Sequence, residues 1–203
     1  MAIFPSRQWI ELVLEAADKS DEYKEAAKDW EGDFLCIIHC DEEFLEDLSR
    51  KEVIEGFLTF LDMMPSEGKR KYKGSPLGDL FEKKLGVSLD ASTKEWDPDD
   101  MSLKISSLSA EDVSGAELYF WADFWHGRVR SMTGVAPGEH EDAAFKLSGK
   151  YSSWKLLVSG QQDTMRLVMS NRLQLEGDIQ YMMKRMKAVV ALSKEVLSVV
   201  PID

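Results

Sequence analysis

The chain is poor in the residues that build disulfide frameworks, metal centres and rigid turns. It contains two cysteines, three histidines and six prolines among 203 residues. Cys36 and Cys40 lie four residues apart in a run that reads as a strand, where a rise of about 3.3 Å per residue separates their Cα atoms by about 13 Å. A disulfide tolerates roughly 7 Å. Both cysteines are therefore expected to be free, as in a reducing compartment.

Positive charge and long apolar runs are also scarce. Lys and Arg number 25 against 37 Asp and Glu, which gives a net charge of -12. This balance argues against nucleic acid, whose binding depends on neutralised phosphates, and against adsorption to anionic membranes. No apolar run approaches the ~18 residues of a membrane span, and the amino-terminal MAIFPSRQWIE lacks a signal-peptide pattern. We therefore expect a cytoplasmic protein without a membrane span.

Catalytic signatures are absent as well. The chain has no Gly-x-Ser-x-Gly elbow, phosphate loop, dinucleotide fingerprint or His-Glu-x-x-His helix. His126 could act as a general base with Asp123 or with a distant acid, but it falls at a hairpin turn, where polar residues are favoured for backbone reasons. We expect no enzymatic activity and no cofactor.

The remaining histidines do not predict a metal site. His39 lies between Cys36 and Cys40, a combination that suggests zinc, yet on a strand the two cysteines point to one face and the histidine to the other. His140 lies in the acidic loop GEHED, where a solvated charge is the simpler interpretation of a weak cation site.

The first forty residues predict two helices and a strand. Ser6 can cap a helix that runs to about Lys19, and Ser20 or Asp21 begins a second one. After Gly32 the run 34–40 carries apolar or weakly polar side chains on both faces. This is typical of a central strand that is covered on both sides.

A charged segment, 41–114, has a helical pattern and interrupts the strands. A helix or helix pair is expected before Pro65, followed by the basic loop EGKRKYKGSP, which we expect to be exposed, and by short helices. We interpret this segment as a helical insertion after the first strand.

The next region predicts most of the sheet. Residues 118–125 alternate in polarity, His126 and Gly127 supply a turn, and Arg128 to Val135 form the second arm of a hairpin. DAAFKLSG gives a fourth strand, and Arg172 to Glu176 a fifth. We expect a single α+β domain over residues 1–203, with about five strands in a sheet that is mostly antiparallel until the last strand, and with helices on one face.

Two groups of large side chains on the hairpin call for an explanation. Arg128 and Arg130 could hold an anionic head group, although salt bridges are the favoured interpretation in a chain this rich in acids. Tyr119, Trp121 and Trp125 alternate onto one face. We expect this face to be covered by the inserted helices or by another subunit.

The last fifty residues show the most distinctive pattern. A helix at Tyr151 to Ser159 ends at Gly160, and Asp163 caps a second helix. After the fifth strand, Asp178 caps a long closing helix that reaches Val200. Its apolar residues recur at three- and four-residue steps: Ile179, Met182, Met183, Met186, Val189, Val190, Val196, Leu197 and Val200. Methionines on such a face adapt to irregular apolar shapes, but the stripe is equally consistent with a packed core.

The order of these elements resembles the end of the sterol carrier protein type 2 family. The matching residues are Gly160, Asp163, Met169, Leu173, Leu175, Gly177 and Asp178. Asn171 replaces a frequent glycine of the family, and Asn tolerates the same left-handed turn. The likeness covers about 6–40 and 115–200 and leaves the segment 41–114 outside the family pattern.

The resemblance implies an apolar tunnel between a curved sheet and helices. We therefore predict non-catalytic binding or transfer of a hydrophobic ligand: a lipid, a fatty acyl chain or a sterol-like molecule. The candidate lining residues are Phe120, Phe145, Met165, Val168, Met169, Leu173, Leu175, Ile179, Met182, Met183 and Met186. Two other hypotheses stay open: an interaction or oligomerisation module with a filled core, which could be a homodimer, and an enzyme that uses His126 and Asp123.

Overall fold

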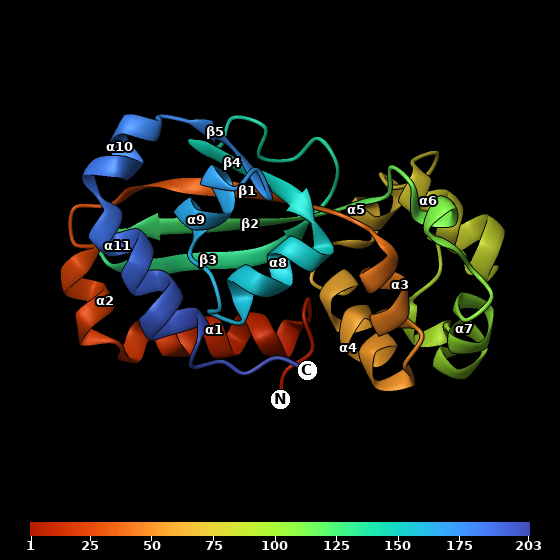
Figure 1. Ribbon diagram of the computed structural model, residues 1–203. Coiled ribbons are helices and arrows are strands. Elements are labelled where there is room, and N and C mark those ends of the chain that lie inside the picture. Colours follow the sequence, from red (N-terminus) through yellow and green to blue (C-terminus); the bar gives the residue numbers. More distant parts are fainter.

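The computed structural model describes residues 1–203 as a five-stranded sheet with helices against one face and at one end (Figure 1). The strands are β1 (Glu31–His39), β2 (Glu117–Trp125), β3 (Arg128–Val135), β4 (Phe145–Lys150) and β5 (Leu173–Gly177), in the spatial order β3-β2-β1-β4-β5. The predicted α+β class with five strands is confirmed. The helices lack the length and apolar character that a membrane crossing requires.

The sheet has one parallel pairing, and it lies in the middle. β1 runs antiparallel to β2 and parallel to β4, whereas β5 is antiparallel to β4. The prediction that the parallel partner would be the last strand is therefore wrong. The loop 136–144 carries the chain from the edge strand β3 across to the far side of β1. Residue alternation within a strand contains no information about which neighbour it chooses.

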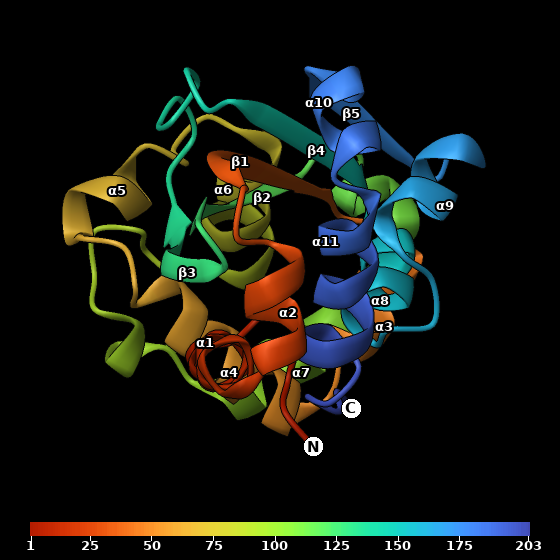
Figure 2. The same ribbon diagram turned by 90° about the vertical axis from the view of Figure 1, so that its left-hand side faces the viewer.

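The amino-terminal helices α1 (Arg7–Lys19) and α2 (Asp21–Ala26) begin where the sequence predicts. The Ser6 hydroxyl accepts a hydrogen bond from the Trp9 amide at 3.0 Å, and the Ser20 hydroxyl accepts one from the Tyr23 amide at 3.1 Å. These caps satisfy amides that have no partner inside the helix. Figure 2 shows α1 and α2 on the same side of the sheet as the carboxy-terminal helix α11 (Met186–Ala191).

The elements that carry the family resemblance adopt the expected local geometry. α8 (Tyr151–Val158) ends before Gly160, which has a φ of 71°, and Asn171 takes a left-handed φ of 55°. α9 (Thr164–Met169) is capped by Asp163, whose carboxylate accepts from the Arg166 amide at 3.0 Å. These turns confirm the helix ends that the sequence predicts.

The predicted long closing helix is divided into three pieces. α10 (Ile179–Lys184) ends at Arg185, whose φ of -110° and ψ of 26° leave the helical region, and α11 begins immediately afterwards. A π-helix, η4 (Leu192–Leu197), follows α11. The prediction of one continuous helix is wrong because Arg185 is held outside it by contacts with the first part of the chain, which periodicity along the helix does not reveal.

The segment 41–114 forms short helices at one end of the sheet (Figure 1). They are α3 (Glu42–Leu48), α4 (Lys51–Leu61), α5 (Ser66–Arg70), α6 (Pro76–Asp79), η1 (Leu80–Leu85), η2 (Thr93–Glu95), α7 (Pro98–Ile105) and η3 (Ala110–Val113). The predicted helix pair before Pro65 is present as α3 and α4. Most of the predicted basic loop is exposed as expected, including Arg70, Lys71 and Lys73. Lys69 and Tyr72 are instead buried, and the Tyr72 hydroxyl donates to the Val135 carbonyl at 3.2 Å.

A polar cluster joins this segment to the carboxy-terminal part of the chain. The Asp47 carboxylate on α3 accepts hydrogen bonds from the Tyr151 hydroxyl at 3.0 Å and from the Lys155 ammonium at 2.7 Å, both on α8. Its second oxygen accepts from Arg50 at 2.9 Å. Because Asp47 is nearly enclosed, these bonds fix α3 against α8.

The aromatic residues on the outer face of the sheet have three different surroundings. Tyr119 packs near Tyr72 of the segment 41–114, as expected. Trp121 instead stacks on His140 of the loop 136–144 and donates to Asp33 at 2.6 Å. Trp125 remains 39% exposed. The prediction that inserted helices or another subunit cover all three is thus met within this chain only at Tyr119.

Candidate ligand-binding site

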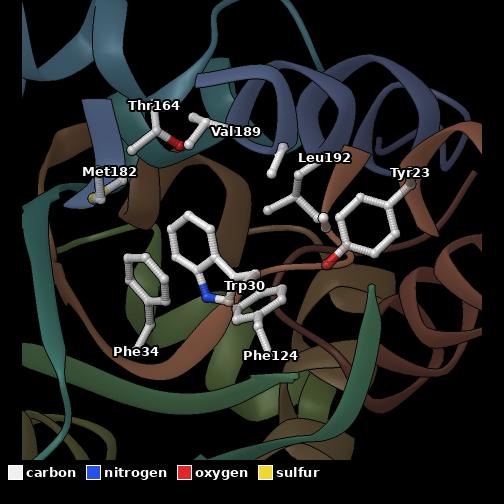
Figure 3. A pocket seen from close by; sticks show the side chains of 10 residues that line it. Tyr23, Trp30, Phe34, Phe124, Thr164, Met182, Val189 and Leu192 are labelled. Atoms are coloured by element: carbon white, nitrogen blue, oxygen red, sulfur yellow. The ribbon is translucent and has the colours of Figure 1, made fainter. Parts of the chain in front are cut away.

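Two adjoining apolar cavities lie between the sheet and its covering helices. The larger has a volume of about 70 Å³ and the smaller about 30 Å³. Both are lined by Phe34, Phe124, Thr164 and Leu192. The larger is also lined by Trp9, Val13, Cys36, Phe120, Ala122, Val129, Met132, Leu147, Trp154, Leu157, Val158 and Leu197. The smaller, shown in Figure 3, is also lined by Tyr23, Ala27, Trp30, Met182, Ala188 and Val189.

The floor of the larger cavity follows from strand alternation. Phe34 and Cys36 on β1, and Phe120 and Ala122 on β2, point to the helical side of the sheet. In the register of the two strands Cys36 lies opposite Phe120, and Ala122 lies opposite Phe34. Each large ring thus faces a small side chain. The two small residues leave space that a larger pair would fill.

The π-helix η4 supplies part of the roof. Leu192 and Leu197, its first and last residues, both line the larger cavity. Residues five apart lie about 140° apart around an α-helix, whereas the i→i+5 bonding of a π-helix brings them to one side. The wider turn therefore lets both leucines face the cavity.

The polar groups of the cavity walls are few and uncharged. The Trp30 indole donates to the Gly32 carbonyl at 3.1 Å, and the Trp154 indole donates to the Ile37 carbonyl at 3.0 Å. Burial raises the pKa of the Tyr23 phenol and that of the Cys36 thiol, so both groups are protonated at neutral pH. No Lys, Arg, His, Asp or Glu lines either cavity.

Tyr181 and Arg185 connect α10 to the loop between α2 and β1. The Tyr181 hydroxyl accepts from the Glu31 amide at 2.7 Å, and the Arg185 guanidinium donates to the Asp29 carbonyl at 2.8 Å. The guanidinium lies 3.6 Å from the centre of the Tyr181 ring, which meets the Trp30 ring edge to face. Trp30 lines both this cavity and the surface groove outside it. We call these contacts, made by Tyr181 and Arg185 with 29–31, the Tyr181–Arg185 latch.

A model of the SCP-2 sterol transfer family matches residues 89–190, half of the chain. The match includes 89–114, so the expectation that the whole segment 41–114 lies outside the family pattern is wrong, and it does not reach 6–40, where a likeness was expected. The chain belongs to this family. No curated protein matches it significantly.

Solved structures of SCP-2 type share the fold of the whole chain. A crystal structure of sterol carrier protein 2 is 17% identical, with a TM-score of 0.51 and 93% of each chain covered. A solution structure of a conserved hypothetical protein from Thermus thermophilus is 16% identical, with a TM-score of 0.54, and covers 100% of this chain and 97% of its own. At these identities the likeness concerns the fold alone.

The structure divides the eleven predicted lining residues into three groups. Phe120 lines the larger cavity and Met182 the smaller. Phe145, Met165 and Leu173 are buried in the core, and Val168, Leu175 and Met186 are half-buried against it. Met169, Ile179 and Met183 are exposed by 80%, 49% and 54%. Ligand contact stays a prediction, but the single inward-facing methionine stripe is wrong, because on α10 Met182 is buried while Ile179 and Met183 are exposed.

Most residues of the cavity walls were not predicted from the sequence. Trp9 and Val13 on α1, and Trp154 and Leu157 on α8, are buried residues of these helices that line the larger cavity and were not predicted as ligand-binding residues. Their helical spacing shows burial only, since a cavity wall and a packed core have the same periodicity. The small side chain Ala122 between buried aromatic residues was the available signal.

The residues considered for chemistry form other pairs. His126 contacts Glu31 at 2.7 Å, while Asp123 binds Arg130 through two hydrogen bonds of 2.8 and 3.0 Å. The structure therefore contradicts the pairing of His126 with Asp123 and shows the alternative partner, a distant acid, which is Glu31. The salt-bridge interpretation of Arg130 is confirmed. His39 contacts Glu117 at 3.0 Å, on the opposite side of β1 from the cysteines.

Proposed function

We propose that this chain binds and transfers a hydrophobic ligand without catalysis, in the two cavities between the sheet and helices α1, α2, α8 and α11. The observation that carries the proposal is a pair of adjoining cavities with almost wholly apolar walls, in a chain of the SCP-2 sterol transfer family. Lipids, fatty acyl chains and sterol-like molecules are the ligand classes. Pocket shape and desolvation would provide the affinity, and no reaction is required.

Binding requires the cavities to expand. Sites for ligands of drug size have volumes of about 300–1,000 Å³, well above the 70 and 30 Å³ found here. The helical wall of the cavities can move more easily than the sheet, because α10, α11 and η4 are short and are joined at irregular positions. Met182 and the half-buried Met186 can adapt to different shapes. We infer that ligand entry separates this wall from the sheet.

The energetics favour a chain of moderate length. Burial of one methylene contributes about 0.8 kcal/mol, so ten methylenes contribute about 8 kcal/mol. Association itself costs about 4–15 kcal/mol. An apolar body of about eight to ten carbons therefore exceeds the lower end of the association cost and can bind, whereas a much shorter one binds weakly.

We further infer that the ligand enters through the Tyr181–Arg185 latch. The latch lies between the smaller cavity and a surface groove, and Trp30 contacts both. Its bonds are made to backbone atoms of the loop between α2 and β1. Breaking them would release α10 without unfolding the sheet.

Mass spectrometry of the natively purified protein tests the proposal. The intact complex and its organic-solvent extract are both weighed, and we expect a stoichiometric lipid in the extract. A protein that is empty, and that also fails to bind fluorescent fatty acids and sterols, would contradict the proposal. If the empty protein also elutes as a dimer, the interaction module with a filled core becomes the better explanation.

A variant that fills the larger cavity tests whether the ligand binds there. Ala122→Leu puts three additional carbon atoms into the larger cavity from the middle of β2. We expect it to lower ligand affinity at least tenfold while the thermal midpoint of the empty protein is kept or raised, because the new side chain fills vacant space. Ala110→Leu, an exposed position on η3, is the matched control and should leave binding unchanged. Equal affinity of both variants would exclude this cavity as the site.

A further inference from the structure

Two hydroxyl groups that face the cavities, those of Thr164 and Tyr23, make no hydrogen bond within the protein. Thr164 lines both cavities and Tyr23 lines the smaller one. Their exposed fractions are only 6% and 2%. Figure 3 shows both hydroxyl oxygens directed inwards, towards the middle of the lining side chains. Because buried polar groups are nearly always hydrogen-bonded, these two are the groups that a ligand would satisfy.

Other polar atoms in the walls are already satisfied or out of reach. The indoles of Trp30 and Trp154 donate to backbone carbonyls. The Trp9 indole nitrogen has no partner, but it is sealed by surrounding protein atoms. Thr164 and Tyr23 are therefore the polar groups that face the vacant space.

The charge of the walls restricts the ligand further. Neither cavity is lined by Lys, Arg, His, Asp or Glu. A carboxylate or phosphate inside would be buried without an opposite charge, which is strongly unfavourable. A hydroxyl side chain can donate to an alcohol, ketone or ester oxygen without that penalty.

Building on the proposed function, we propose that these cavities select an uncharged ligand with an oxygen atom, an alcohol, ketone or ester, over a fatty-acid anion. Thr164, on the wall common to both cavities, is the principal hydrogen-bonding residue. Tyr23, on α2, provides a second position at the other side of the smaller cavity. The two residues thus determine which end of a lipid can be enclosed.

Competition against bound Nile red, an uncharged dye, tests this selection with three eight-carbon probes. Octan-1-ol carries one oxygen, octane carries none, and octanoate at pH 8 is ionised. We expect Thr164→Val to lower the affinity for octan-1-ol about tenfold, as loss of a buried hydrogen bond predicts. Its affinity for octane should be unchanged. Tyr23→Phe should act in the same direction. Octanoate should bind at least 100-fold more weakly than octan-1-ol to the unaltered protein.

The controls separate this selection from folding and from the proposed function. Thr133→Val, on β3 outside the cavities, should leave all three affinities unchanged. The empty Thr164→Val protein should keep or raise its thermal midpoint, since a buried unpaired hydroxyl is removed. Unchanged octan-1-ol affinity in both cavity variants, or octanoate binding as tight as octan-1-ol, would overturn the selection. Failure of octane and octan-1-ol alike to displace the dye would overturn ligand binding itself.

Discussion

At the scale of single residues, Cys36 offers a direct report on cavity occupancy. Its thiol lines the larger cavity, and burial raises its pKa, so the reactive thiolate is rare at pH 8. In a Cys40→Ala protein we expect slow labelling of Cys36 by a maleimide, and labelling about tenfold slower again when a bound ligand occupies the cavity. The rate is measured by intact mass spectrometry.

Cys40 supplies the matched control. It is also buried but lines neither cavity, so its labelling in a Cys36→Ala protein should not respond to ligand. A ligand that protects both cysteines equally would indicate general stabilisation. Protection of neither would place the ligand elsewhere.

Residue-level features were predicted best where the backbone alone decides them. Caps such as Ser6 and Asp163 and the left-handed Asn171 depend on a few neighbouring residues, so the sequence contains the whole cause. The partners of His126 and Trp121 lie far away in the chain. Those contacts depend on sheet register, which local pattern does not specify.

At the scale of elements, the latch should control the rate of ligand exchange. Arg185→Ala removes the bond to the Asp29 carbonyl and the contact with Tyr181, while the cavity walls stay intact. Because a charged hydrogen bond contributes about 1.5 kcal/mol, we expect exchange to become about tenfold faster. Stopped-flow displacement of a fluorescent lipid measures the rate.

Lys194→Ala is the control for the latch, since Lys194 is an exposed cation on η4 that lines neither the smaller cavity nor the groove. Its exchange rate should match that of the unaltered protein. Tyr181→Phe, which loses the bond from the Glu31 amide, should give an intermediate acceleration. Identical rates in all four proteins would show that the ligand enters by another route.

The closing region shows why elements were predicted less reliably than caps. After Asp178 the apolar residues recur with a helical period throughout, which predicts one long helix with a single apolar face. The structure interrupts it at Arg185 and widens it at η4. Both changes are consequences of packing against α2 and the sheet, which override the local preference for a continuous helix.

At the scale of the whole molecule, Asp47 should stabilise the joint between the segment 41–114 and the remainder of the chain. Asp47→Asn retains the shape but removes the charge that Lys155 and Arg50 share. We expect the free energy of unfolding to fall by about 2 kcal/mol, measured by urea denaturation. Glu15→Gln, in an exposed pair with Lys19, should change it by only a few tenths. Equal losses in the two variants would argue against a special role for the joint.

The buried tyrosines should make stability fall in alkaline solution. Burial raises the pKa of Tyr23, Tyr72 and Tyr151 in the folded protein. Above pH about 10 the unfolded chain therefore loses phenolic protons that the folded chain keeps, so stability decreases as pH rises. Urea denaturation at pH 8 and pH 11 measures the decrease. Tyr72→Phe should reduce it, and an unchanged pH dependence in that variant would contradict the assignment.

The α+β class and the number of strands were predictable from the sequence, whereas the order of the strands in the sheet was not. Alternation and turn residues were sufficient for five strands in an α+β domain, and the family resemblance indicated where an apolar site lies. The position of the parallel pair and the identity of the cavity walls were not contained in those patterns. Both depend on contacts between residues 31–39 and residues beyond 117.

The central position of β1 has a consequence for synthesis on the ribosome. This strand is made early, yet its partners β2 and β4 begin at Glu117 and Phe145. At a translation rate of about 5–20 residues per second, roughly 4–16 s pass between synthesis of the apolar run 34–38 and translation of the first residue of β2. During that interval the backbone amides of β1 have no neighbouring strand with which to form hydrogen bonds. The nascent chain is consequently a substrate for chaperones that shield extended apolar segments, and α3 and α4 are the earliest later elements able to form beside it.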